Sequence, residues 1–526
     1  MRQLLPSLLL VVAGCSAGLN GQDIPTPASA FRPEDRVVIG NFARVTAIAA
    51  SFDRVFVAFP SAVGVWLPMT RRWEVPRRPP RPGMLRDVRA GIVDPSDQSL
   101  WLVSATGWIH YTPIMERWDE GPLPGTPTSI GIDPADMLGG AWFRIGGGWY
   151  HQPRVGGITA PGRPSASLRL APTIDDALRD VPQLRALAPR LLTGPGLEQG
   201  RITAAAPLPD GSGWLIGTTT LGVLALDRTG SDAPPLAHGL RGTAVGALAL
   251  LPDGIWVATD VETRTSAELA VLSLDLATTI AIDGRPPFGL PFAAARRIVP
   301  ADRALWLATD QGVVRVNLDD RRTTRWSEAE GLPDARVLTV ARYQGRIVAA
   351  TMRGLVEVTG DGTVTRIAEQ FVEPAYSLLA RGDTLWVGTA RGLFAWLPGE
   401  SGLAEPEGLR RLAGARVPIR GIGYFADTMV VLAEQQLLWR DPLTGAWSPG
   451  APLNGMGRLT AFAVTNDGIW VGGDGGAAFL RPTTPPLRRL LVPLDLPGPV
   501  TAIASEGTYL WIGTIDGLVR LRLEGR

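Results

Sequence analysis

A single cysteine carries the most specific chemistry in this sequence. Cys15 follows Val-Ala-Gly at residues 12–14, and before these lie an apolar run over residues 4–12 and the basic Arg2. This order is typical of a lipoprotein signal peptide, in which the thiol accepts a diacylglycerol and becomes the first mature residue. We therefore predict lipidation at Cys15. An ordinary secretory signal with an incidental cysteine is the alternative.

A second group with potential chemistry is an arginine-rich, proline-rich segment over residues 71–89, RRWEVPRRPPRPGMLRDVR. Guanidinium groups bind phosphate and carboxylate groups in a bidentate manner, as on lipopolysaccharide or an acidic glycan. The candidates for binding an anion or a partner are Arg71, Arg72, Arg77, Arg78 and Arg81. The alternative, which we favour, is a solvated loop whose prolines keep it from pairing with neighbouring strand edges.

Other catalytic or metal-binding patterns are sparse. The three histidines, His110, His151 and His238, have no metal-ligand spacing, and no second cysteine exists. Asp133 and Asp136 in IDPADMLGG resemble calcium ligands in part, but we interpret them as turn residues. We predict neither a metal nor a cofactor.

Composition and charge narrow the class of protein. The 526 residues are 45% hydrophobic and 19% charged, which suits folded cores, and 51 basic residues nearly balance 50 acidic ones. The near-zero net charge argues against nucleic acid as a partner. Residues 16–34 are rich in Gly, Pro and Ala and predict a flexible tether. Similarity to Gram-negative lipoproteins implies that Ser16, after the lipidated cysteine, directs the protein to the outer membrane.

A repeated phrase supplies the evidence for architecture. LWLATDQGVVRV at 305, LWVGTARGLFAW at 385 and LWIGTIDGLVRL at 510 are copies of one unit, and degenerate copies surround them. We count about eleven copies spaced by roughly 40–45 residues, which is the length of a four-stranded propeller blade. The sequence therefore predicts an all-β fold built from about eleven four-stranded blades of a β-propeller.

Each repeat predicts its own strands. An apolar inner strand precedes the tryptophan strand, and a Thr-x-x-Gly hairpin follows it, where glycine supplies a positive φ. The recurring tryptophans are large enough to fill the space between neighbouring sheets, so we expect them in the core. Threonines recur on the inner strands, where they could line a central channel, although we favour a structural role; these are Thr46, Thr203, Thr339, Thr460 and Thr501.

The phrase Leu-Trp-Ile/Val-Gly-Thr followed by Gly-Leu resembles the two-component-regulator propeller repeat over most of residues 45–526. The resemblance implies propellers that sense extracytoplasmic ligands, commonly glycan fragments, ahead of a membrane helix and a histidine kinase. This sequence shows neither of these after its last repeat. Only binding of a ligand or partner is therefore expected to carry over.

Eleven blades exceed one typical ring, so we favour two tandem rings over one large ring. The expected organisation is a signal peptide at 1–14, a lipidated cysteine and tether at 15–34, and sets of blades at 35–290 and 291–526. The segment at 36–40, RVVIG, is expected to complete the last blade. A short helical insertion is predicted near 173–191, starting with a capping pattern of Thr173 and Asp176.

These observations favour a non-catalytic recognition or scaffold lipoprotein of the cell envelope, anchored to the outer membrane, that binds an unknown envelope protein or glycan on its propeller faces. One alternative is a propeller enzyme, such as a lyase, glycosidase or quinone-dependent dehydrogenase, with a site at the channel mouth. A second is an extracytoplasmic ligand sensor for a separate membrane kinase.

Overall fold

The computed structural model describes residues 35–523, apart from 41, 77, 82, 186–200, 220, 230–235, 237–238, 261–266, 277–278, 283–289, 291, 407–416, 434–435 and 483. The predicted signal peptide, the lipidation site Cys15 and the tether therefore lie outside the described residues. So do Arg77 and His238.

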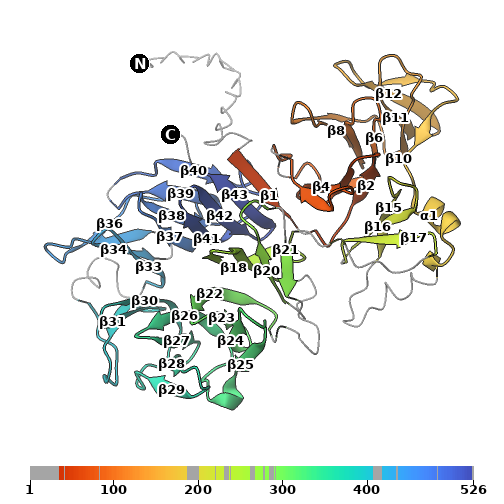
Figure 1. Ribbon diagram of the computed structural model, residues 1–526. Helices are drawn as coiled ribbons and strands as arrows, with labels where there is room; N and C mark the ends of the chain where they lie inside the picture. Colours follow the sequence, from red (N-terminus) through yellow and green to blue (C-terminus); the bar gives the residue numbers. More distant parts are fainter. Residues whose placement is uncertain are drawn as a thin grey trace, which may run out of the picture.

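The described chain folds into eleven antiparallel sheets, eight of them four-stranded, in which strands adjacent in sequence pair as neighbours (Figure 1). This all-β arrangement is consistent with a β-propeller. Short turns connect the strands within each sheet, because every unit alternates apolar strand segments with Gly-, Asp- or Pro-containing turns.

Four sheets come first in the chain, and we call them the four-sheet row. Their strands are β2 (Ala47–Ala50), β3 (Val55–Ala58), β4 (Val63–Leu67) and β5 (Arg72–Glu74); β6 (Val88–Val93), β7 (Leu100–Ser104), β8 (Gly107–Thr112) and β9 (Arg117–Pro122); β10 (Pro127–Ile132), β11 (Gly140–Ile145), β12 (Gly148–Pro153), β13 (Ala160–Gly162) and β14 (Arg169–Leu170); and β15 (Ile202–Pro207), β16 (Gly213–Thr218) and β17 (Val223–Asp227). The inner strands contact one another in the order β15, β2, β6, β10.

Seven further sheets follow, and we call them the seven-sheet circle. Their strands are β18 (Ala244–Leu251), β19 (Gly254–Asp260), β20 (Ala267–Leu272) and β21 (Thr279–Ile282); β22 (Ala295–Ala301), β23 (Ala304–Thr309), β24 (Gly312–Asn317) and β25 (Thr323–Trp326); β26 (Val337–Tyr343), β27 (Arg346–Thr351), β28 (Gly354–Val358) and β29 (Val364–Ile367); β30 (Ala375–Arg381), β31 (Thr384–Thr389) and β32 (Gly392–Trp396); β33 (Ile419–Phe425), β34 (Thr428–Ala433), β35 (Leu437–Arg440) and β36 (Trp447–Pro449); β37 (Leu459–Val464), β38 (Ile469–Gly473), β39 (Gly476–Leu480) and β40 (Arg488–Leu491); and β41 (Val500–Glu506), β42 (Tyr509–Thr514), β43 (Gly517–Arg522) and β1 (Arg36–Ile39).

The inner strands of the seven-sheet circle contact one another in chain order from β18 to β41, and β41 also contacts β18. Figure 1 shows these sheets in green to blue, apart from the red-orange strand β1, and the four-sheet row in orange to yellow-green beside them. The expected division between residues 290 and 291 falls between β21 and β22, whose sheets are neighbours within the circle. The order of contacts instead changes between β17 and β18.

The first strand completes the last sheet, as the sequence predicted. β1 pairs antiparallel with β43, with Arg36 opposite Leu521 and Ile39 opposite Leu518. The Arg36 guanidinium donates to the carbonyl oxygen of Asp495 at 2.6 Å. This pairing covers the outer edge of β43 with a strand from the other end of the chain.

The recurring tryptophans pack between neighbouring sheets, which confirms the prediction for the core. Trp101, Trp470 and Trp511 are fully or almost fully buried. Each lies in an apolar cluster that includes residues of the following sheet; Trp511, for example, packs with Val245 of β18. Burial of an aromatic side chain of this size is a major source of stability.

The Thr-x-x-Gly hairpins also form as predicted. In four of them the threonine hydroxyl donates to the glycine carbonyl oxygen three residues later, at 2.7–3.0 Å, at Thr309, Thr351, Thr389 and Thr514. The glycines have φ between 117° and 141°, in the region that disfavours other residues, at Gly312, Gly354, Gly392 and Gly517.

The predicted helical insertion contains α1 (Ile174–Asp180), which begins with the expected capping box of Thr173 and Asp176. Its buried Ala177 joins Val181 and Leu184 in an apolar cluster with Trp214 and other residues of β15, β16 and β17. The helix therefore packs against the last sheet of the four-sheet row, as expected of a packing element.

Candidate functional site: the channel of the seven-sheet circle

A cavity of about 520 Å³ lies where the seven inner strands meet. Each of these strands shifts its register by one residue against its neighbour, and the extra residue of every such β-bulge lines the cavity. The bulge residues are Gly246, Arg296, Leu338, Tyr376, Arg420, Thr460 and Thr501. Bulges commonly redirect side chains, and here they supply the channel lining.

The lining is rich in arginine. Arg296, Arg297 and Arg420 line the cavity together with one carboxylate, that of Asp260. The guanidinium carbon of Arg420 lies 4.0 Å from the ring centroid of Tyr376, which is a cation–π contact between β33 and β30. This contact orients Arg420 without neutralising its charge, so the described lining carries a net positive charge.

Two arginines of the channel, Arg296 and Arg297, have no charged partner among the described residues. The side chain of Arg297 keeps contact with solvent in the cavity, yet protein surrounds it, and this desolvation lowers the pKa of its guanidinium. Within the described part of the chain, neither Arg296 nor Arg297 forms a side-chain hydrogen bond or ion pair. The hydrogen-bond donors of these two guanidinium groups are therefore available to water or to an oxyanion in the cavity.

Hydroxyl side chains on the inner strands hold the circle together. The Thr501 hydroxyl donates to the carbonyl oxygen of Val245, so it links β41 to β18 where the circle closes. The Thr460 hydroxyl donates to the carbonyl oxygen of Val500 in the next sheet, at 2.5 Å. Thr339, Thr460 and Thr501 all line the cavity, so at two of these positions a structural role and a place in the channel coincide.

The two other recurring threonines belong to the four-sheet row. Thr46 donates to the carbonyl oxygen of Ala58 within its own sheet, at 3.1 Å. The Thr203 hydroxyl is buried without a hydrogen bond and lines a cavity of about 180 Å³ beside Thr173, at the start of α1. The threonine pattern therefore marks the inner strands of both groups of sheets.

The chemistry available in the channel suits binding of an anion better than acid–base catalysis. Guanidinium groups offer planar, charge-assisted donors for carboxylate, phosphate or sulfate oxygens, and the Tyr376 phenol lies beside them. Among the described lining residues, Asp260 is the single carboxylate and there is no histidine. Glycoside hydrolysis commonly uses a pair of carboxylates, and the described lining supplies one.

The arginine-rich segment lies along the outer strand β9 of the next sheet. Trp118 donates from its indole nitrogen to the carbonyl oxygen of Arg78 at 2.7 Å, and Arg81 pairs with Glu120. Arg72 lies 3.9 Å from Asp275 of the seven-sheet circle. The segment thus contacts a neighbouring outer strand, whereas the loop interpretation had its prolines keep it away from such edges; binding of an anion by these arginines stays a prediction.

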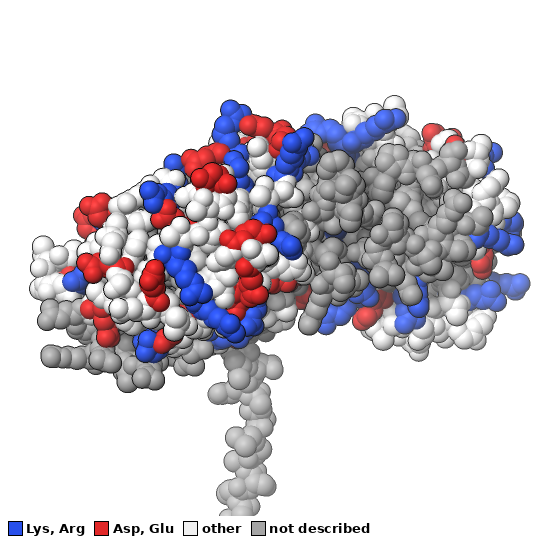
Figure 2. Space-filling model, turned by 90° about the horizontal axis from the view of Figure 1, so that it is seen from below, with Lys and Arg blue, Asp and Glu red and all other residues white. Residues whose placement is uncertain are grey.

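Arg71 is exposed and has a left-handed φ of 51° at the turn before β5. On the face shown in Figure 2, basic and acidic side chains are interspersed. That mixture follows from the balance of charges in the sequence. In the channel, by contrast, three described arginines line the cavity with one described carboxylate.

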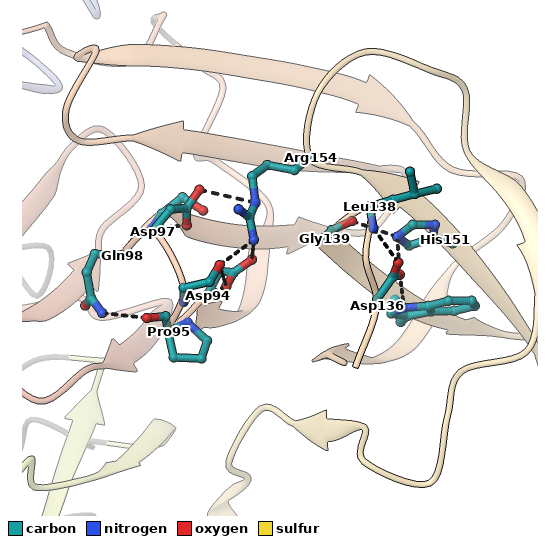
Figure 3. A network of polar contacts seen from close by, with 12 residues as sticks. Asp94, Pro95, Asp97, Gln98, Asp136, Leu138, Gly139, His151 and Arg154 are labelled. Carbon is teal, nitrogen blue, oxygen red and sulfur yellow. Dashed lines mark hydrogen bonds and ion pairs between the residues drawn. The ribbon is translucent and has the colours of Figure 1, made fainter. Parts of the chain in front are cut away.

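A histidine–aspartate pair lies in the four-sheet row (Figure 3). His151 Nε2 is 2.9 Å from Asp136 Oδ2 and 3.0 Å from the carbonyl oxygen of Gly139, so Nε2 carries the proton. The Trp142 indole donates to the same carboxylate at 3.1 Å, and its ring stacks on the imidazole. These contacts fasten the β10–β11 loop, which carries Asp136 and Gly139, to β11 and β12.

Arg154 in the same region joins two sheets. Its guanidinium lies 2.6 Å from Asp94 and 3.3 Å from Asp97, which connects the β12–β13 turn to the β6–β7 turn (Figure 3). Asp133 and Asp136 accept backbone hydrogen bonds from Ala135 and Leu138 within their loop. They are turn residues, as predicted from the sequence.

No group of three or more metal-binding side chains occurs in the described part of the chain. Among the described helices, none is long and apolar enough to cross a membrane. Sequence reasoning missed Arg296, Arg297, Arg420 and Tyr376. The usable signal was the register of the repeats, because Arg296 and Arg420 occupy the same bulge position as Thr460 and Thr501.

Comparisons with known proteins identify similar folds only. No family profile and no curated protein matches the chain. A designed protein, Ika8, is 15% identical with a TM-score of 0.40, over 62% of this chain and 96% of its own. The extracellular domain of a putative one-component system from B. thetaiotaomicron is 14% identical with a TM-score of 0.35, over 91% and 70%. Virginiamycin B lyase from Staphylococcus aureus is 14% identical with a TM-score of 0.43, over 53% and 95%. At these values no activity or ligand transfers to this chain.

Proposed function

We propose that this protein is a non-catalytic recognition lipoprotein of the cell envelope that binds a small oxyanion in the channel of the seven-sheet circle. The observation that carries the proposal is that Arg296, Arg297 and Arg420 line one cavity with a single described carboxylate, and that Arg296 and Arg297 have no partner among the described residues. An oxyanion would accept the unused hydrogen bonds and compensate the charges.

The proposal includes a ring arrangement. The seven-sheet circle is a seven-bladed propeller closed by β1, and the four-sheet row is a shorter set of blades inserted between β1 and β18. This division replaces the expected boundary at 290/291 with one between β17 and β18. Support comes from the order of inner-strand contacts and from the Thr501–Val245 hydrogen bond across the closure.

The proposed location rests on the N-terminal motif. Lipidation at Cys15 would leave a mature chain tethered to the outer membrane by residues 16–34, with two or more acyl chains giving stable anchoring. Mass spectrometry of the N-terminal peptide from purified envelopes tests this directly. An unmodified Cys15 in the mature protein would contradict it.

The ligand proposal is tested by calorimetric titration of the full chain with glucuronate, glucose 6-phosphate and glucose. The two anions distinguish a carboxylate from a phosphate ligand, and glucose is the neutral control. We expect an anion to bind and glucose not to bind. Arg297→Gln and Arg420→Gln should each weaken that binding by about 1.5–3 kcal/mol, or roughly 10- to 100-fold.

The matched control is Arg366→Gln, which removes the same charge from the exposed outer strand β29. Its affinity should equal that of the unmodified protein within about twofold, because the residue lies outside the cavity. Binding of glucose as strongly as the anions, or equal losses in all three variants, would contradict a channel site.

A further inference from the structure

Apolar side chains project from one type of turn in the four-sheet row. The turns that join the first strand to the second, and the third to the fourth, lie at the same end of each sheet because the strands run antiparallel. In the first three sheets these turns carry the exposed apolar residues Phe52, Met69, Ile114, Met115, Met137, Leu138, Val155 and Ile158.

The corresponding turns of the seven-sheet circle provide an internal comparison. Their tips are mostly polar, as in the pairs Asp302–Arg303 and Gln344–Gly345. Leu443 in the β35–β36 turn is 94% exposed, and Leu274 and Leu487 in the β20–β21 and β39–β40 turns are 40% and 56% exposed. Because the same fold tolerates polar residues at these tips, folding does not require the apolar ones in the four-sheet row.

The contacts drawn in Figure 3 hold three turns of the four-sheet row in place: the β6–β7, β10–β11 and β12–β13 turns. Arg154 joins the β12–β13 turn, which carries Val155 and Ile158, to the β6–β7 turn of the neighbouring sheet. His151 holds the β10–β11 loop, which carries Met137 and Leu138, at the carbonyl of Gly139. The apolar residues of the third sheet therefore lie at one end of the four-sheet row, and we call the turns at this end the rim.

The carboxylates of this rim are already satisfied within the protein. Asp94 accepts from Arg154 and Ser96. Asp53 accepts from Ser51 and Arg54, and these partners hold its pKa below the usual value against the effect of burial. These two carboxylates are paired within the protein and therefore lose less on meeting an apolar phase than unpaired carboxylates would.

We infer that the apolar tips of the four-sheet row insert into the interfacial region of a lipid bilayer. Separate side chains on protruding turns can enter a deformable lipid surface individually, whereas a protein partner would require a shaped complementary surface. The inference rests on the proposed lipid anchor. Residues 15–34 span at most about 70 Å when extended, so the anchor keeps this face within reach of the bilayer, where weak insertion suffices.

The test uses the full lipidated chain in phosphatidylcholine vesicles. Cysteine is introduced in Met137→Cys, Val155→Cys or Leu443→Cys and labelled with an environment-sensitive fluorophore; Cys15 is the only native cysteine, and lipidation occupies it. Leu443 is the matched control, since it is as exposed as Met137, at 94% against 101%, on the same type of turn.

We expect a blue-shifted emission at positions 137 and 155, and quenching by lipid-attached nitroxide at least about twofold stronger than at position 443. Equal, water-like emission at all three positions would overturn the inference, and would leave a protein partner as the occupant of this face. Mass spectrometry of the labelled chain separates the two failures: a fluorophore on Cys15 refutes the lipid anchor, whereas water-like emission from a lipidated chain refutes insertion alone.

Discussion

His110 makes the stability of the four-sheet row depend on pH. Its side chain is buried on β8 and stacks on Trp101 with ring centroids 4.0 Å apart, and its Nε2 atom has no hydrogen-bond partner among the described residues. Burial lowers the pKa of His110 from 6.5 to about 4, although several nearby aspartates oppose the shift. The folded protein therefore resists protonation of this imidazole.

The sign of the effect follows from linkage. Above pH 6.5 the imidazole of His110 is neutral in the folded and the unfolded protein, so it does not change the free energy of unfolding. Between pH 6.5 and 4 the imidazole is protonated in the unfolded protein but stays neutral in the folded one, which favours unfolding. A shift of this size corresponds to roughly 3 kcal/mol when fully expressed, and to about 2–3 kcal/mol between pH 7.5 and 4.5. Stability is lost as the pH falls.

The variant His110→Phe retains an aromatic ring against Trp101 but does not titrate. Urea unfolding followed by tryptophan fluorescence at pH 7.5 and 4.5 gives the free energy of unfolding of both proteins. We expect the unmodified protein to lose about 2–3 kcal/mol more than His110→Phe over this interval. Titrating carboxylates affect both proteins alike, so an identical pH dependence would refute the reasoning.

Three further predictions concern the stability of the seven-sheet circle, and urea unfolding tests each. Thr501→Val removes the hydrogen bond to Val245 that closes the circle and should cost about 1 kcal/mol; an unchanged midpoint would show that this bond contributes nothing. Gly312→Ala and Gly392→Ala both introduce about 1–3 kcal/mol of strain at a positive φ, but only the first places a Cβ atom 2.0 Å from a carbonyl oxygen, so it should unfold at lower urea. Trp511→Ala should cost about 3–5 kcal/mol, and a loss under 1 kcal/mol would contradict its place between sheets.

Much of the fold could be predicted because each repeat contains the same strand and turn patterns at a regular spacing. The Thr-x-x-Gly hairpins, the buried tryptophans and the closing strand β1 follow from local patterns that recur with every sheet. The division of the sheets could not be predicted in the same way. It depends on which inner strands touch, and β18 meets both β22 and β41 through contacts that no local pattern encodes.

The candidate site was harder to predict from the sequence than the fold. Thr460 and Thr501 mark the bulge position of the inner strands. The arginines at that position were missed, because Arg296 and Arg420 replace the threonine in their repeats. The segment 71–89 was predicted as a candidate anion site because it contains many arginines. In the structure, Arg81 of that segment pairs with Glu120, whereas Arg297 in the channel has no partner among the described residues.

The most direct test of the channel claim is the unfolding free energy of Arg297→Met, measured with and without glucose 6-phosphate. If Arg297 is retained to bind an anion, its replacement removes an uncompensated charge, so the variant should be at least as stable as the unmodified protein. It should also lose the stabilisation that the ligand confers on the unmodified protein. A marked loss of stability with ligand stabilisation intact would contradict the account, because Arg297 would then serve the fold and not a ligand.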